Sequence, residues 1–179
     1  MTVIFDIDGT LSNPDHRRPF LKEEPKNWSA FNETISLDSV YYPARQALHL
    51  FAQRHVIFVV SARESTSEIR TQTVQWLFEH TNIFFKDDLP LLTDSQREIL
   101  AELHTPGQGY GKYIKCGNLY MREPKDYRDD TIIKKELLDL IISQGYTPTI
   151  VFDDRTRVVN MWRENGLYVF NCNQSGDDF

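Results

Sequence analysis

Apolar and polar positions follow two patterns along the chain. Continuous apolar runs rich in β-branched and aromatic residues predict buried strands at residues 3–5, 56–60, 119–122, 149–152 and 167–170. Elsewhere, apolar residues spaced three or four apart predict helices at residues 40–54, 66–80, 94–104, 131–143 and 156–165. Strands that alternate with helices indicate an α/β fold with a central, mostly parallel sheet flanked by helices.

Residues 11–39 lack either pattern and are rich in Pro, Asn, Asp and charged residues. They predict a long loop with one short helix, and loops of this length usually act as functional lids. Arg17 and Arg18, followed by Trp28 and Phe31, could hold a phosphate and stack a base. The alternative is that the two aromatic residues anchor the loop to the core.

Residues 81–118 form an insertion with a Gly- and Tyr-rich part at 105–117. This part does not fit a nucleotide-binding P-loop, because the required spacing after a strand is absent. Two interpretations remain, a solvated insertion or a contact with a nucleic-acid backbone through Tyr110, Lys112, Tyr113 and Lys115.

Candidate chemistry follows the predicted strands at the points where they end. Asp6 and Asp8 follow the first strand, and Asp153 and Asp154 follow the fourth. Carboxyl ends of parallel strands share one edge of the sheet, so these acids should converge there. Oxygen ligands suit Mg²⁺, which would neutralise their mutual repulsion. Because residues two apart in an extended chain point the same way, Asp6 and Asp8 are expected to face one site.

Ser61 ends the second strand and precedes backbone amides that enter a helix, which is an arrangement suited to binding phosphate. The alternative is that Ser61 merely caps this helix. Lys134, one turn inside a later helix, is either a surface lysine or the cation that balances the acids.

Composition limits the possible partners and location. The 179 residues predict one globular domain, and the formal charge of -6 argues against broad binding to a polyanion. Cys116 and Cys172 have no metal-ligand spacing, so free thiols are expected. With no room for a signal peptide before the first strand and no long apolar run, we expect a cytoplasmic protein without a membrane partner.

The motifs resemble those of the haloacid dehalogenase superfamily. D-x-D-G-T is matched by Asp6, Asp8, Gly9 and Thr10, and Ser61, Lys134 and the Asp153–Asp154 pair follow in the family's order. The resemblance implies a Rossmann-like fold with a small cap or none, and hydrolysis of a phosphomonoester through an aspartyl phosphate. It assigns Asp6 as nucleophile and Asp8 as general acid and base, with Lys134 as the balancing cation. Mg²⁺ would be held by Asp6, the backbone carbonyl of Asp8, Asp153 and Asp154. The phosphoryl group would be bound by Gly9, Thr10, Arg17, Ser61, the Ala62 amide, Arg63 and Lys134.

A closer resemblance is to the 3'-phosphatase domain of phage-type polynucleotide kinase-phosphatases and their stand-alone relatives. It is carried by His16–Arg17, Trp28, Phe31, residues 60–64, 121–128 and 153–162, and the end of the chain at 175–179. The departures are a missing kinase half and the insertion at 87–118. The resemblance implies that the substrate is a 3'-phosphorylated nucleic-acid end, and that a phage-encoded protein would act in the host cytoplasm.

Three alternatives remain open. A phosphatase of free nucleotides or other small phosphomonoesters would share the same chemistry. A phospho-accepting receiver domain also has acids and a lysine around magnesium, but it places its acidic pair early in the chain. A binding module on an inactive scaffold is expected to have lost one of Asp6, Asp8, Lys134 or Asp153, and all four are present.

Overall fold

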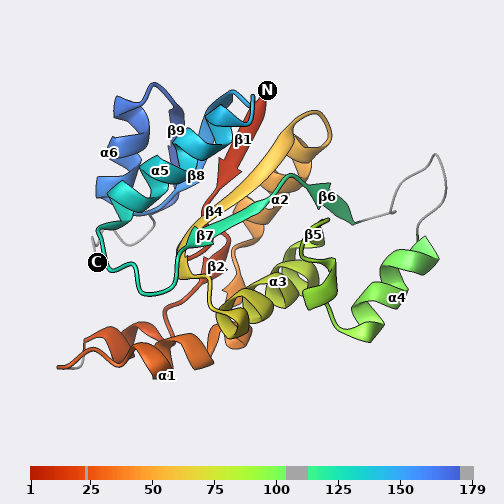
Figure 1. Cartoon of the computed structure of the whole chain (residues 1–179), viewed down its shortest axis with the longest axis horizontal. Coiled ribbons are helices and arrows are strands. Elements are labelled where there is room, and N and C mark those ends of the chain that lie inside the picture. The colour runs from red at the N-terminus through yellow and green to blue at the C-terminus, as the bar shows by residue number, and fades with distance from the viewer. Residues whose placement is uncertain (23, 104–112, 174–179) are drawn as a thin grey trace.

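A parallel sheet runs through the centre of the molecule and carries helices on both faces (Figure 1). The computed structural model describes residues 1–22, 24–103 and 113–173. Within this part of the chain the main sheet has the strand order β7-β4-β1-β8-β9, and all neighbouring strands pair in parallel. Its strands are β1 (Thr2–Phe5), β4 (Val56–Glu64), β7 (Leu119–Arg122), β8 (Pro148–Asp153) and β9 (Tyr168–Asn171). The predicted α/β class and parallel sheet are therefore confirmed.

Alternation along the strands separates two hydrophobic layers. Val3 and Phe5 of β1 pack on the face covered by α2 (Tyr42–Ala52) and α3 (Ser67–Thr81), while Ile4 packs on the opposite face. That opposite face is covered by α5 (Asp130–Ser143) and α6 (Thr156–Glu164). Strand β1, buried on both faces, is thus the centre of the core.

The helices begin and end where local chemistry favours it. Pro43 lies in the first turn of α2, where a missing N–H costs nothing. The Thr66 side chain accepts a hydrogen bond from the Ile69 amide and caps α3. Thr66, rather than Ser61, is therefore the cap of this helix. At the other end of the chain, α6 is followed by Gly166 with φ of 81°.

Residues 11–39 contain more structure than the predicted loop with one helix. Strands β2 (Ser12–Asn13) and β3 (Ser39–Val40) pair in antiparallel fashion, and between them lie η1 (Arg18–Leu21), α1 (Trp28–Glu33) and η2 (Ile35–Leu37). Elements this short leave no periodic pattern in the sequence. The Asn27 side chain caps α1, and fully buried Ile35 ties η2 to the core. In the view of Figure 1, this segment lies below the sheet.

The described part of the insertion at 81–118 is likewise built from regular elements. It contains β5 (Ile83–Phe85), η3 (Leu89–Leu91), α4 (Asp94–Leu103) and β6 (Ile114–Cys116), with β5 and β6 forming a parallel pair. Tyr110 and Lys112 lie outside the described residues. The Tyr113 ring stacks on Phe78 with 4.6 Å between centroids, so this tyrosine contributes to packing.

Two further expectations change in detail. Strand β4 continues to Glu64, so Ser61 lies inside a strand rather than at its end. The spacing of Ile133, Leu137, Leu140 and Ile141 predicts that all four face inward from α5. Ile133 and Ile141 are buried, together with Leu138, whereas Leu140 is 42% exposed. Cys116 and Cys172 are free thiols as expected. Among the described residues, none of the helices combines the length and apolarity needed to cross a bilayer.

Candidate active site

Three carboxylates and one lysine meet at the carboxyl end of the sheet. Asp6 follows Ile4 and Asp153 follows Val151 by two positions, so both side chains point to the α5 side. There the Lys134 ammonium donates to Asp6 Oδ1 at 2.8 Å and to Asp153 Oδ2 at 2.7 Å. Ligand atoms of Asp6, Asp153 and Asp154 all lie within 4.8 Å of one another. We call these three residues the acid cluster.

The acid cluster carries more negative charge than Lys134 neutralises. Burial raises the pKa of Asp6 well above its ordinary value, and Lys134 only partly opposes this. Burial and the neighbouring Asp153 raise the pKa of Asp154 to about 7. A divalent cation would offset the burial and mutual repulsion of these carboxylates, and their all-oxygen donor set matches the preference of Mg²⁺.

Neighbouring groups fix the orientation of Asp153. The indole N–H of Trp162 donates to its Oδ2 at 3.0 Å, and the Arg155 amide donates to its Oδ1 at 3.2 Å. Both donors come from the segment that follows β8, so one stretch of chain supplies the carboxylate and its supports. Such supporting contacts hold a metal ligand in one rotamer.

Gly9 permits close contact between the first turn and the acid cluster. Its φ is 87°, and a Cβ at this position would lie 1.9 Å from Asp154 Oδ2. A side chain here is excluded by both the backbone conformation and the space. The predicted role of Gly9 in phosphate binding stays a prediction, while its structural role is the approach to Asp154. Thr10 is buried in the same turn.

Asp8 belongs to a second group of charges next to the acid cluster. Its carboxylate accepts from Arg63 Nε and Nη2, both at 2.7 Å, and from Arg17 Nη2. Burial acts in the other direction, but Arg63 and Arg17 hold the pKa of Asp8 well below its ordinary value. The side chains of Asp6 and Asp8 therefore have different partners, although both were expected to face one site. The strand ends at Phe5, which ends the alternation on which that expectation rested.

Asp38 is the member of this group that the sequence did not reveal. It is buried, and it accepts from Arg17 Nε and Nη2 at 2.7 Å and from Arg63 Nη2 at 3.1 Å. His16 Nε2 lies 2.9 Å from the same carboxylate. Two carboxylates thus face two guanidinium groups, which balances the buried charge. A single Asp beside the short β3 strand belongs to no motif, so only the fold brings it to the arginines.

The aromatic residues of the 11–39 segment have different environments. The Phe31 ring covers the Arg17 guanidinium, whose central carbon lies 4.1 Å from the ring centroid. Trp28 meets Phe31 edge to face at 5.8 Å and remains 55% exposed. Phe31 therefore anchors the segment, as one interpretation held, whereas Trp28 keeps a surface available for stacking.

The predicted phosphate loop is a bulge in β4. Its register with β7 shifts between Ser61 and Glu64, so Ala62 and Arg63 leave the regular ladder. The Ser61 hydroxyl is buried and accepts from the Arg63 amide at 3.2 Å. Arg122 fixes the bulge by donating through Nε to the Ala62 carbonyl at 2.9 Å. Arg122 in turn pairs with Asp130, which also pairs with Arg155.

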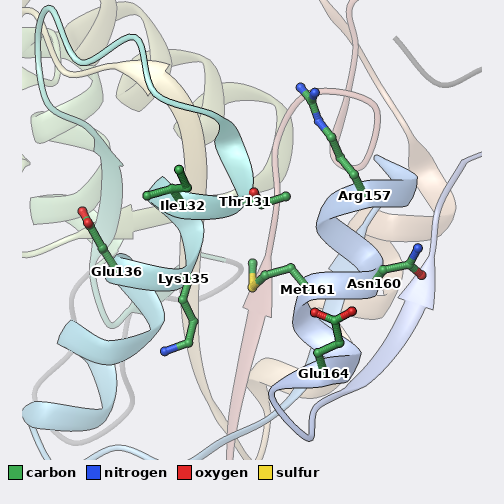
Figure 2. Close-up of a pocket in the computed structure, with 8 residues that line it drawn as sticks. All are labelled: Thr131, Ile132, Lys135, Glu136, Arg157, Asn160, Met161 and Glu164. Atoms are coloured by element: carbon green, nitrogen blue, oxygen red, sulfur yellow. The ribbon is translucent and has the colours of Figure 1, made fainter.

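A groove of about 480 Å³ lies apart from this centre, between α5 and α6 (Figure 2). Its walls carry Lys135 and Arg157, which pair with Asp139 at 2.6 Å and Asp129 at 3.0 Å respectively. None of its lining residues belongs to the acid cluster or contacts Asp8. Its two cationic side chains are thus paired with neighbouring acids, and nothing in the described lining indicates a ligand.

Comparison with known proteins relates this chain to a phosphatase domain. A family model for the polynucleotide kinase PNKP phosphatase domain matches residues 93–179. The matched range contains Lys134, Asp153 and Asp154, and also most of the 87–118 segment that the sequence set apart. A chain in a structure of the Pnkp1/Rnl/Hen1 complex is 28% identical with a TM-score of 0.63, over 95% of this chain and 45% of that one.

Two further structures share the fold. In another structure of the Pnkp1/Rnl/Hen1 RNA repair complex, the match has 28% identity and a TM-score of 0.60, over 95% of this chain and 41% of that one. The haloacid dehalogenase-like family hydrolase SP0104 from Streptococcus pneumoniae is 10% identical with a TM-score of 0.53, over 95% of this chain and 83% of that one. The chain spans less than half the length of the chains that it matches in the two Pnkp1/Rnl/Hen1 structures.

Proposed function

We propose that the chain, which resembles the PNKP phosphatase domain, is a phosphatase of the haloacid dehalogenase type that removes the 3'-phosphate from polynucleotide ends through an aspartyl phosphate. One observation carries the chemistry. Asp6 directly follows the central strand as a buried carboxylate bound by Lys134, and Asp8, two residues later, is bound by Arg63 and Arg17. These contacts support Asp6 as the nucleophile and Asp8 as the proton carrier.

Asp6 attacks phosphorus, and the bond between phosphorus and the departing alcohol oxygen breaks. Lys134, bound to Asp6 Oδ1, fixes the orientation of the nucleophile. Asp8 gives its proton to the alcohol oxygen. It then takes a proton from water, which attacks the phosphorus of the aspartyl phosphate and frees Asp6.

Asp8 can carry a proton only when its interactions with Arg17 and Arg63 weaken, because these interactions lower its pKa. A phosphoryl group with negative oxygens competes for the guanidinium groups of Arg17 and Arg63. Arg17 Nη1 is buried and has no acceptor among the described residues, so it offers a donor to such an oxygen. Substrate binding thereby weakens the effect of Arg17 and Arg63 on Asp8 and returns its pKa toward the range of a general acid.

Mg²⁺ would be held by the acid cluster together with the backbone carbonyl of Asp8. When bound, it supplies the positive charge that lets an anionic phosphate approach a carboxylate. Two unit charges about 4 Å apart repel by about 4 kcal/mol at an effective dielectric constant near 20. Several such repulsions arise between the phosphate and the carboxylates of the site, and the single positive charge of Lys134 cannot offset them all. Ser61 and the Ala62 amide, which lie at the β4 bulge, would hold the phosphoryl oxygens.

Substrate preference separates the polynucleotide proposal from a phosphatase of free nucleotides. We expect catalytic efficiency on a 3'-phosphorylated oligonucleotide to exceed that on a 3'-mononucleotide by at least about tenfold, which corresponds to about 1.4 kcal/mol of transition-state binding. Phosphate release from both substrates and from a 5'-phosphorylated oligonucleotide is measured at low and high salt. A gap that shrinks with salt supports backbone contacts. Equal efficiencies, or a preference for 5'-nucleotides, would favour the small-molecule alternative.

A further inference from the structure

A tyrosine next to the active site is exposed to an unusual degree. Tyr127 lies in the loop between β7 and α5 and is 83% exposed. In Figure 1, this loop follows the carboxyl end of β7, and the segment that contains α1 lies at the same edge of the sheet. An aromatic ring this exposed contributes little packing to the fold, and its face is free to contact a ligand.

The backbone on both sides of Tyr127 is held firmly. Arg122 Nη1 donates to the carbonyls of Asp126 and Arg128, each at 2.7 Å. Arg128 also pairs with Asp126 at 2.6 Å and with Glu136 at 2.7 Å. The ring is therefore presented from a rigid frame, and little conformational entropy is lost when a flat ligand stacks on it.

The same arginine places Tyr127 close to the phosphate loop. Arg122 Nε donates to the Ala62 carbonyl at 2.9 Å while its Nη1 holds the two residues that flank Tyr127. One guanidinium group therefore spans the gap between the phosphate-binding bulge and the tyrosine loop. A phosphate bound at Ala62 would have its own nucleoside, or the next one, within reach of the phenol ring.

We infer that Tyr127 stacks on a nucleobase of the polynucleotide end and is a specificity-determining residue for this class of substrate. The inference rests on the proposed function. Stacking on an aromatic side chain is tolerant of sequence because every base has a π-face. Tyr127 therefore favours a single-stranded end without selecting its bases, and it does nothing for a phosphomonoester that lacks a base.

The test compares Tyr127→Ala, Tyr127→Phe and the matched control Tyr168→Ala, which changes a tyrosine 67% exposed at the start of β9. The substrates are a 3'-phosphorylated single-stranded oligonucleotide, versions with an abasic terminal or penultimate residue, and glycerol 2-phosphate. We expect Tyr127→Ala to lower kcat/KM on the intact oligonucleotide by about tenfold. Efficiency on glycerol 2-phosphate is unchanged, Tyr127→Phe behaves as wild type, and Tyr168→Ala changes neither.

The abasic oligonucleotides identify the stacked base. At one of the two positions, base removal lowers wild-type efficiency about as much as Tyr127→Ala does, and the two changes together cost no more than either alone. A Tyr127→Ala loss that is equal on glycerol 2-phosphate would show a structural role and overturn the inference, as would no loss on the oligonucleotide. A wild-type enzyme without preference for the oligonucleotide would overturn the proposed function as well, before any variant is compared.

Discussion

Asp6 and Asp8 are two residues apart, yet they have opposite electrostatic environments. Burial beside two other carboxylates raises the pKa of Asp6, whereas Arg63 and Arg17, against the effect of burial, lower the pKa of Asp8. The difference comes from the groups that face each carboxylate, Lys134 and the acid cluster in one case and the arginines in the other. One short motif thus supplies two carboxylates with different chemistry.

At the residue scale, we expect Asp6→Asn to abolish phosphate release while the protein stays folded. The amide has nearly the same size and keeps the packing at the end of β1, but it is a poor nucleophile. Release of phosphate and thermal unfolding are measured on the same sample. Lys135→Ala, which removes a neighbouring lysine paired with exposed Asp139, serves as the control that keeps activity. Appreciable turnover by folded Asp6→Asn would contradict the assignment.

Asp154 predicts how the stability of the metal-free protein depends on pH. Its pKa of about 7 lies above the ordinary value of 3.8, so the folded state binds a proton that the unfolded state has released. The free energy of unfolding should therefore fall as the pH rises from about 4 to 7. Asp154→Asn removes this charge, and we expect its unfolding temperature in chelator at pH 8 to exceed that of wild type by about 5 °C.

With Mg²⁺ at pH 8, we expect wild type to have a higher unfolding temperature than Asp154→Asn. The ion stabilises wild type at pH 8 by binding the ionised acid cluster, and it has a weaker effect on Asp154→Asn. Thermal unfolding with and without Mg²⁺ at pH 5 and pH 8 gives the comparison. The prediction would be wrong if the metal-free wild type were more stable at pH 8 than at pH 5 and Asp154→Asn did not raise the unfolding temperature. The ionised Asp154 carboxylate would then not destabilise the folded protein.

At the scale of elements, the predictability of each segment follows its length and its burial. The strands of the central sheet and the helices that cover it carry long patterns, which is why the sequence placed β1, α3 and α6 correctly. The short elements of 11–39 and the bulge at Ser61 depend on pairings with distant segments. For the same reason, the contact between Asp6 and Lys134 could be expected from the sequence, whereas the contacts of Asp38 with Arg17 and Arg63 could not.

The 11–39 segment should affect catalysis through two different aromatic residues. Phe31→Ala removes the ring over Arg17, and we expect kcat/KM to fall about tenfold on every substrate because Arg17 loses its fixed position. Trp28→Ala removes an exposed ring and should lower efficiency only on oligonucleotides. Both variants are assayed on an oligonucleotide and on glycerol 2-phosphate. The same substrate profile for the two variants would contradict this division.

At the scale of the whole molecule, the fold brings charge of both signs to one edge of the sheet. The formal charge of the chain is -6, yet Arg17, Arg63 and Arg122 are buried around the site. Attraction for an anionic substrate is therefore local rather than spread over the surface. This arrangement suits recognition of the end of a nucleic acid better than binding along its length.

Metal removal tests the site as a whole. We expect activity to disappear in excess chelator and to return when Mg²⁺ is added, because only a divalent cation balances the acid cluster. Calcium should restore it poorly, since its longer and more variable coordination misplaces the reacting groups. Phosphate release is followed during titration with each ion. Full activity in chelator would show that Lys134 alone neutralises the three carboxylates.

The central position of β1 also has a consequence for synthesis of the chain. Among the strands of the main sheet, β1 leaves the ribosome first, but its neighbours in the sheet are β4, which begins at Val56, and β8, which begins at Pro148. At about 5–20 residues per second, the second of these follows roughly 7–30 s later. Until β8 has been made, one edge of this apolar strand lacks its native neighbour, so β1 can complete its pairing only late in the synthesis of the chain.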